Sequence, residues 1–310
     1  ARIQHGKACP GILALLEVSS KSAAMLSASD FGFAIAPRLN AAGRLDDMTI
    51  GVQCLLADDY DQALGYAQTL NDLNLERRSI EKDMKQEADA IVAEMTLGDQ
   101  PLSGLCLYQE HWHQGIVGLV ASRVKDQVNR PAIVFARAND HSDEIKGSGR
   151  SIKGLHMRDL LEAISVAHDG LILKFGGHAM AAGLSIKQDQ FRTFAKLFEQ
   201  HCANQLKSMT LDNTLESDGE LAGHHFNVDV AAMLAQAGPW GQGFPEPLFH
   251  GRFKVMDQHL VGSYHLKMVV QPVGTSMVVD AIAFYVDLKR WPNRQCGEVT
   301  MAYHLAVNTF

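Results

Sequence analysis

The sequence lacks any apolar run close to the roughly 18 residues that a membrane-spanning helix needs. Its first residues, Ala1 to Lys7, include neither an initiator methionine nor the apolar segment of a signal peptide. We therefore expect a chain that has no membrane contact and that begins within a longer protein.

Cysteine and metal-ligand clusters are also scarce. The five cysteines lie far apart and form no Cys-x-x-Cys pair, which argues against a disulfide framework or a zinc ribbon and fits the reducing cytoplasm. No Asp-x-Asp or Asp-His-His cluster is present to hold a pair of divalent ions. The adjacent aspartate pairs at 46–47 and 58–59 would point to different sides of the backbone. The sequence therefore predicts no metal site in this chain.

Positive charge is too scarce for a protein that coats nucleic acid over a broad surface. The formal net charge is -7, with 28 Lys and Arg against 35 Asp and Glu. Contact with a polyanion must therefore be local. Residues 145–158 offer one place for it, because four cations occur there without an acidic residue, although a solvated basic loop explains them equally well.

Hydrophobic periodicity divides the chain into helical, mixed and β-rich parts. Residues 11–28 predict a short apolar helix, and residues 37–44 predict a loop because Pro and Gly punctuate them. Residues 60–96 predict one long amphipathic helix with a solvated charged face, since apolar residues recur at spacings of three, four or seven. Strand and helix signals then alternate as in an α/β domain, and after residue 211 short strands suggest a small β-barrel.

Two glycine-containing segments carry residue types that suit a phosphate. Gly176-Gly177-His178 would let backbone N–H groups approach an anion beside an imidazole, but a glycine-rich turn is the simpler interpretation of so short a motif. In the loop-like segment 147–151, within a stretch at 145–152 that is predicted to be extended, Ser148 and Arg150 alternate with glycines, and a guanidinium can bind two phosphate oxygens at once. A tight turn with a surface arginine is the alternative.

Three further residues are candidates for contact with an anion. His113 lies just before a predicted helix, whose free N–H groups and dipole attract anions, whereas a metal at His111-x-His113 would lack a third ligand. Arg38 and Arg44 lie on one loop and would contact a backbone phosphate or pair with neighbouring aspartates, which the sequence leaves open. Aromatic residues of the β-rich part would stack bases or, more commonly, fill a core; they are Trp240, Phe244, Phe249, Tyr264 and Tyr285.

Four stretches occur in a characteristic order: FAIAPRLNAAGRL at 33–45, QGIVGLVASR at 114–123, GSGRS at 147–151 and FGGHAMAAG at 175–183. Together they resemble the RecJ-type single-stranded-DNA exonucleases of the DHH phosphoesterase family. The last stretch alone would indicate only the DHH-associated domain, which other phosphoesterases and alanyl-tRNA synthetase relatives share. The resemblance covers nearly the whole chain, including residues 240–247, which lead into a part similar to the family's OB-fold.

The resemblance implies an α/β DHH-associated domain with a long connecting helix, followed by an all-β OB-fold-like barrel. The implied parts are the tail of the catalytic core with an interdomain region at 1–59, the connecting helix at 60–96, the DHH-associated domain at 97–210 and the OB-fold-like domain at 211–310. The metal-binding DHH domain is expected before Ala1, and the barrel is expected to continue beyond Phe310.

The resemblance also implies a function. The chain would be the substrate-binding C-terminal portion of a 5′ to 3′ single-stranded-DNA exonuclease of repair and recombination, a cytoplasmic, metal-dependent phosphodiesterase. Mn²⁺ or Mg²⁺ would serve the full-length enzyme, and the fragment would bind none and be inactive alone. The implied partners are single-stranded DNA with a 5′ phosphate and single-strand-binding protein, with no membrane. The alternatives are a stand-alone module for single-stranded DNA or a protein partner, and a DHH-type oligonucleotide or cyclic-dinucleotide phosphodiesterase.

Site residues follow from the resemblance position by position. Ser148 and Arg150 would hold the 5′-terminal phosphate. His178, with Gly176 and Gly177, would face the phosphate near the absent metal centre and assist catalysis. Contacts to other phosphates would come from His113, Arg38 and Arg44.

Overall fold

The structure is a computed structural model that describes residues 2–96, 102–139, 142–207, 209, 214–241, 243–262 and 264–308. It consists of two compact units, Ala1–Asp212 and Asn213–Phe310. No helix in these described ranges is both long and apolar enough to cross a bilayer.

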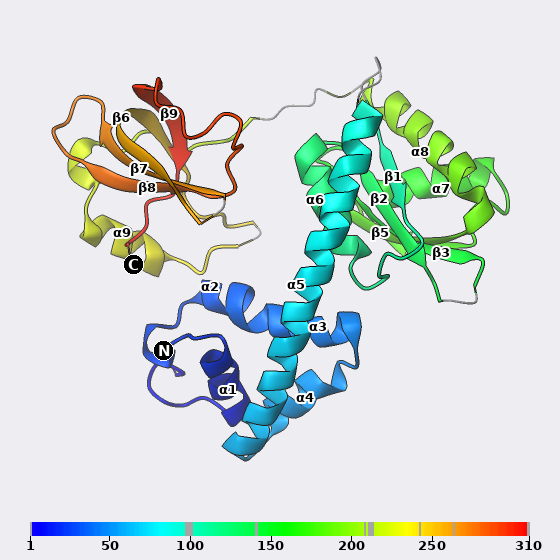
Figure 1. The fold of residues 1–310 in the computed structure, drawn as a ribbon, viewed down its shortest axis with the longest axis horizontal. Helices are drawn as coiled ribbons and strands as arrows, with labels where there is room; N and C mark the ends of the chain where they lie inside the picture. The colour runs from blue at the N-terminus through cyan, green and yellow to red at the C-terminus, as the bar shows by residue number, and fades with distance from the viewer. Residues whose placement is uncertain are drawn as a thin grey trace. The chain divides into compact units, whose positions relative to one another are not determined.

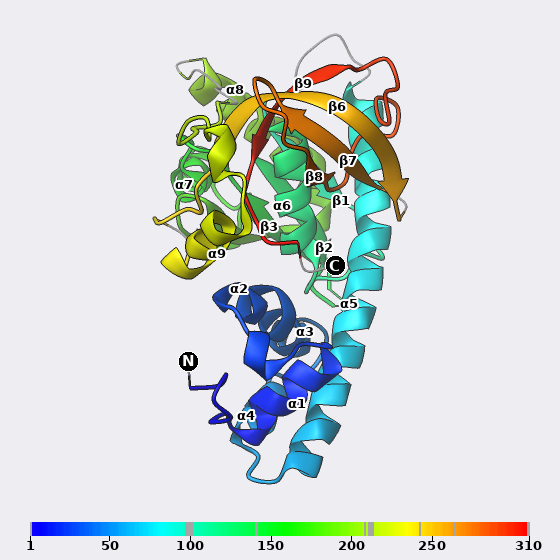
Figure 2. The ribbon, with the colours of Figure 1, turned by 90° about the vertical axis from the view of Figure 1, so that its left-hand side faces the viewer.

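The first unit begins with a lobe of short helices that pack against the first half of the long helix α5 (Figures 1 and 2). The predicted helix at 11–28 is wrong in extent: α1 ends at Val18, because a polar run follows and Ser20 adopts a left-handed φ of 55°. The buried centre of the lobe includes Leu15, Cys54 and Leu70. The helices of the lobe are α1 (Pro10–Val18), α2 (Ala28–Asp30), α3 (Ala36–Leu45) and α4 (Thr49–Leu56).

The loop predicted for residues 37–44 is a helix in the structure. Pro37 stands in the first turn of α3, where its missing N–H group costs no hydrogen bond and its fixed φ suits the helix. Gly43 lies inside the same helix. The proline therefore marks the start of a helix here, and Arg38 and Arg44 both lie on that helix.

The long connecting helix is confirmed as α5 (Tyr60–Thr96), whose 37 residues extend roughly 55 Å at 1.5 Å per residue. Its second half buries Met84, Ala88 and Val92 in the α/β part of the unit. The expectation of a solvated charged face is wrong at two positions. The side chains of Arg77 and Glu81 are only 11% and 16% exposed, and they form an ion pair of 2.5 Å.

The α/β part confirms the predicted fold class and is built on a five-stranded sheet in the order β1-β2-β3-β5-β4. Strands β1 and β2 are parallel, and the other neighbours are antiparallel. Helix α6 contacts β2 and β3 on one face, and α7 and α8 cover the other (Figure 1). The strands are β1 (Leu105–Tyr108), β2 (Ala132–Arg137), β3 (Glu144–Arg150), β4 (Lys174–Gly177) and β5 (Ala181–Lys187), and the helices are α6 (Val117–Val128), α7 (Met157–Ala167) and α8 (Phe191–Leu206).

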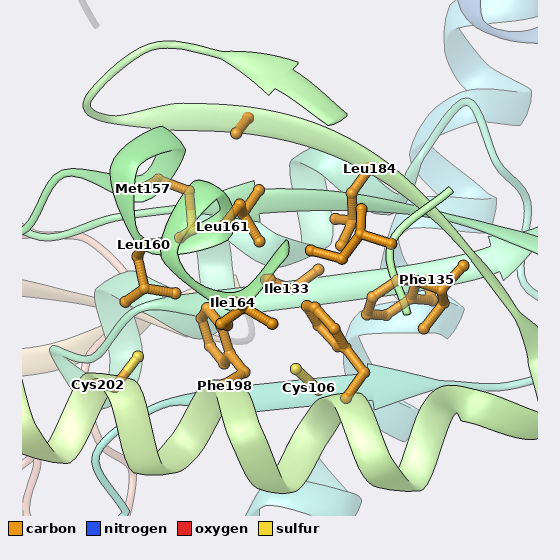
Figure 3. Packing of buried hydrophobic residues seen from close by; sticks show 14 of the residues in the cluster. Cys106, Ile133, Phe135, Met157, Leu160, Leu161, Ile164, Leu184, Phe198 and Cys202 are labelled. Atoms are coloured by element: carbon orange, nitrogen blue, oxygen red, sulfur yellow. The ribbon is translucent and has the colours of Figure 1, made fainter. Parts of the chain in front are cut away.

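The main core lies between the sheet and helices α7 and α8 (Figure 3). Phe135 of β2 packs edge-on against Phe194 of α8, with ring centroids 5.7 Å apart. Phe135 is also paired with Gly147 of β3, and a Cβ at that glycine would lie 2.5 Å from the Phe135 ring. Glycine at 147 is therefore required by the core.

The second unit is mostly β-structure, as predicted. Its four strands form one antiparallel sheet in the order β8-β7-β6-β9, over a core that includes Phe226, Phe253 and Leu266. Helix α9 (Val228–Ala237), which starts where the Asn227 side chain accepts a hydrogen bond from the Val230 N–H group, was not foreseen from the sequence. The strands are β6 (Phe249–Val261), β7 (His265–Pro272), β8 (Val279–Ala283) and β9 (Glu298–Tyr303).

Candidate phosphate site

Arg150 and Ser148 lie on the face of β3 that meets helix α6. The extended conformation predicted for residues 145–152 is confirmed up to Arg150, so the segment at 147–151 is a strand end and not a separate loop. Alternation along β3 sends the glycines at 147 and 149 to the core face and Ser148 and Arg150 to the opposite face. Arg150 Nη1 donates to Ser148 Oγ at 3.0 Å and to the Gly149 carbonyl at 2.9 Å. The two side chains are thus held together as one group.

Gly118, in the first turn of α6, makes room for this pair. A Cβ at position 118 would lie 2.9 Å from Arg150 Nη2 and 3.0 Å from Ser148 Oγ. The guanidinium therefore rests against the backbone at the N-terminal end of a 12-residue helix, where unpaired N–H groups and the helix dipole favour an anion.

Arg44, in the C-terminal turn of α3, contacts the turn that precedes α6. Its Nη1 donates to the Gly115 carbonyl at 3.2 Å. Gly115 is needed for this approach, because a Cβ there would lie 2.0 Å from the Arg44 carbonyl oxygen. Burial, and then the positive charge of Arg44, lower the pKa of the Arg150 guanidinium. Two cations are consequently held close together.

One carboxylate of α5, that of Glu81, partly balances the positive charge of Arg44. Burial and Arg77 lower the pKa of Arg44, while Glu81 opposes that shift. Glu81 also binds Arg77 at 2.5 Å and Arg123 of α6 at 3.5 Å. Arg150 itself forms no ion pair with any carboxylate in the described residues. The cluster is therefore positive overall, which is what an anionic ligand requires.

His113 lies in the turn that precedes α6. Its Nδ1 accepts a hydrogen bond from the Gly115 N–H group at 3.1 Å, so in the neutral ring the proton is on Nε2. The turn is anchored by buried Trp112, whose Nε1 donates to Glu87 Oε2 at 2.8 Å. His111 contacts the same carboxylate oxygen at 2.8 Å.

The Gly176-Gly177-His178 motif forms the end of strand β4 and the turn into β5. Gly177 has φ +145°, and a Cβ there would lie 2.5 Å from the Ala181 carbonyl oxygen, so the tight turn needs glycine. The His178 N–H group donates to that carbonyl at 2.8 Å. Ala181 is the strand partner of Arg150, which places the exposed His178 turn at the same end of the sheet as the arginine.

The sheet face beside Ser148 is poor in side chains. Ser148 pairs with Gly183, which pairs with Gly176, and both glycines are exposed. The neighbouring row places Lys146 and Lys174, both exposed, on either side of Ser185. We call these two rows the open strip. A chain of phosphates can approach the backbone here and meet two lysines.

Arg38 lies apart from this cluster. Its guanidinium donates to Asn71 Oδ1 at 3.0 Å, to the Ala34 carbonyl at 2.7 Å and to the Val18 carbonyl at 3.3 Å. Burial and the nearby Arg78 lower its pKa. The described part of the chain contains no group of three or more His, Cys, Asp or Glu that could hold a metal ion.

Comparison with known families assigns two regions of the chain. Residues 99–204 match the DHHA1 domain, and residues 217–310 match the RecJ OB domain. Over 311 aligned residues the chain is 51% identical to the single-stranded-DNA-specific exonuclease RecJ of Dickeya dadantii (strain 3937) and 49% identical to that of Escherichia coli (strain K12), covering all of this chain and 54% of each relative. The chain thus spans about half the length of these relatives.

Two crystal structures of RecJ have a fold similar to that of this chain. A crystal structure of RecJ in complex with Mn²⁺ from Thermus thermophilus matches with a TM-score of 0.76 and 25% identity, covering 99% of this chain and 43% of that one. The corresponding Mg²⁺ complex matches with a TM-score of 0.75 and 24% identity, over 99% of this chain and 45% of that one.

Proposed function

Since the chain belongs to the RecJ family, we propose that it is the substrate-binding portion of a 5′ to 3′ single-stranded-DNA exonuclease. In this proposal Arg150 and Ser148 bind the 5′-terminal phosphate of the strand. The single observation that carries it is a partly buried guanidinium that is fixed at the start of α6 and has no carboxylate partner among the described residues.

A terminal phosphate suits this group better than an internal one because it offers more oxygens and more charge. Arg150 would bind two of the oxygens, Ser148 would add a hydroxyl, and His113 would donate from Nε2. Arg44 would contribute a second positive charge, held against Gly115. Arg38 would reach a phosphate only by giving up three internal hydrogen bonds, so we infer that it stabilises its lobe instead.

The strand would leave this pocket across the open strip. Gly176 and Gly183 let its backbone lie close to the sheet, and Lys146 and Lys174 would neutralise the following phosphates. The turn at Gly177 would present His178 to the phosphate next to the scissile bond. Binding and orientation are the roles that we assign to this chain.

Hydrolysis would take place on a metal centre built by the other part of the protein. The described residues do not fit a site for Mn²⁺ or Mg²⁺, because no three potential ligands come together among them. We therefore expect the chain alone to release no nucleotides. In the cell the enzyme would act in DNA repair and recombination in the cytoplasm, with single-strand-binding protein as a further partner.

Binding of labelled oligonucleotides tests this proposal. The 310-residue chain should bind 5′-phosphorylated single-stranded DNA more tightly than the same oligonucleotide with a 5′-hydroxyl, and both more tightly than a blunt duplex. With Mn²⁺ present it should release no nucleotides. Equal affinity for the two 5′ ends, or nucleotide release that copurifies with the chain, would contradict the proposal.

A further inference from the structure

A carboxylate that is mostly buried lies close to the cations to which we assign the 5′ phosphate. Glu81 belongs to α5, the helix that packs against both α3 and α6 (Figure 1), and its side chain is only 16% exposed. Its negative charge acts on Arg44, and the charge of Arg44 acts in turn on Arg150. The proposed phosphate pocket therefore contains a group that repels the ligand.

One oxygen of Glu81 is fixed within α5. Glu81 Oε2 accepts a hydrogen bond from Arg77 Nη1 at 2.5 Å. Arg77 is held from its other side by Asn74, whose Oδ1 accepts from Arg77 Nε at 3.4 Å and from Nη2 at 3.2 Å. Asn74 is 1% exposed and the Arg77 side chain is 11% exposed. This row of three residues keeps the carboxylate in place, so it cannot turn into solvent when an anion enters the pocket.

The other oxygen of Glu81 is only loosely paired. Glu81 Oε1 is 3.5 Å from Arg123 Nε, and the Arg123 side chain is 60% exposed, so this contact is weak. Arg44 donates to the Gly115 carbonyl, and the structure describes no hydrogen bond from it to Glu81. The negative charge of Glu81 therefore acts on Arg44 through space and is not used up by a direct contact with it.

Repulsion between Glu81 and a bound phosphate depends on the charge of that phosphate. Charges in a partly buried site interact more strongly than in water, because the effective dielectric constant is about 20 instead of about 80. A terminal phosphate carries close to two negative charges at neutral pH, whereas an internal phosphodiester carries one. Glu81 therefore opposes the binding of a terminal phosphate more than the binding of an internal one.

We propose that Glu81 lowers the affinity of the pocket for the 5′ phosphate and thereby speeds the release of a bound strand end. This inference rests on the proposed function, because it concerns the regulation of the same pocket. An exonuclease must release the terminal phosphate after each cut before the next 5′ end can bind, and most differences in affinity appear in the rate of dissociation. If Glu81 served only to order Arg44, its loss would weaken binding, which is the opposite result.

Glu81→Gln tests the proposal in the intact 310-residue chain, because it removes the charge and keeps an oxygen for Arg77. Fluorescence anisotropy should show roughly fivefold tighter binding of a 5′-phosphorylated dT oligonucleotide, with slower dissociation and a smaller change for the 5′-hydroxyl form. The slope of log K against log salt, here called the salt slope, should not change, since no phosphate contact is gained. Glu76→Gln, an exposed glutamate of the same helix, is the matched control and should bind like the wild type.

A second variant separates the charge of Glu81 from its contacts. Glu81→Asp keeps the charge but shortens the side chain, so it should unfold more easily and still bind the 5′ phosphate like the wild type. Tighter binding by Glu81→Asp would overturn the inference, even if Glu81→Gln does not fold. A folded Glu81→Gln chain that binds the 5′-phosphorylated strand no more tightly than the wild type would also overturn it and leave the proposed function intact. A wild type that binds both 5′ ends equally would overturn the proposed function, and this inference with it.

Discussion

The guanidinium of Arg150 occupies the space that a side chain at Gly118 would need, with Nη2 2.9 Å from the position of that missing Cβ. This relationship joins a strand and a helix that lie far apart in sequence, and it explains how an arginine is held at the start of α6. The chain thereby keeps a cation where the helix already favours an anion.

Replacement of Gly118 by alanine should weaken the preference for a 5′ phosphate without lowering the stability of the fold. The new methyl group meets only the ends of two side chains, so the guanidinium shifts at little cost to the fold, and an alanine favours the helix by roughly 1 kcal/mol. We expect an unchanged or higher unfolding midpoint and roughly tenfold weaker preference for a 5′ phosphate, which corresponds to about 1.4 kcal/mol. Gly65→Ala in α5, where a Cβ meets nothing within 4 Å, is the control and should leave the preference intact.

Gly115→Ala should act mainly on stability. Its Cβ would collide with the backbone of Arg44 at 2.0 Å, so α3 must move away from the turn before α6. We expect a loss of about 1–3 kcal/mol in denaturant unfolding. Gly176→Ala faces open space and should unfold like the wild type, yet bind the oligonucleotide less tightly because its methyl group stands on the open strip. Similar unfolding midpoints for both variants would contradict this account.

Arg38→Met should destabilise the N-terminal lobe without changing the charge contacts to DNA. The substitution removes three hydrogen bonds from a charged donor, a loss of about 2 kcal/mol for such groups. Chemical unfolding checks the first expectation, and the salt slope of oligonucleotide binding checks the second. A reduced slope would show that Arg38 contacts a phosphate after all.

Glu87 should stabilise the turn that carries His113. Glu87→Ala leaves the buried Trp112 Nε1–H group without its acceptor, which costs about 1–3 kcal/mol. Glu87→Gln keeps an oxygen for the indole and should recover most of the stability. Thermal unfolding compares the two variants, and an equal loss in both would mean that the indole hydrogen bond is not what makes Glu87 important.

Thiol reactivity should divide the cysteines by burial. Burial raises the pKa of the Cys54, Cys106 and Cys202 thiols, so they remain protonated and shielded at pH 8. Cys9 is exposed and Cys296 is half-buried. A disulfide reagent should therefore modify two thiols in the folded chain and five in denaturant. Rapid reaction of more than two thiols in the native state would contradict the buried positions.

Local periodicity was enough to predict several elements of the fold. The apolar repeat at residues 60–96 predicted helix α5, and the alternation of strand and helix signals after it predicted the α/β part. The failures involve proline and glycine. Pro37 starts a helix instead of interrupting one, and Gly147 is required by Phe135, a residue of another strand that the local sequence does not reveal.

The candidate site, like the fold, could be predicted from the sequence only in part. Residue type made Ser148 and Arg150 candidates but favoured a plain glycine-rich turn for Gly176-Gly177-His178. The family resemblance added that turn to the site, and the roles of all these residues stay predictions. The residues that surround Arg150 were missed, because Arg77 and Glu81 looked like a solvated helix face and Gly118 like an ordinary helix residue. Their importance depends on where α3, α5 and α6 meet, and a spacing pattern within one helix cannot show that.

The preference of the chain for a 5′ phosphate in the Arg150→Gln variant tests the central claim most directly. The ratio of affinities for 5′-phosphorylated and 5′-hydroxyl oligonucleotides is measured for the wild type, for Arg150→Gln and for Arg192→Gln, an exposed arginine of α8 that serves as control. The account predicts that the ratio falls close to one in Arg150→Gln and stays at the wild-type value in Arg192→Gln. An unchanged ratio in a folded Arg150→Gln chain would contradict it.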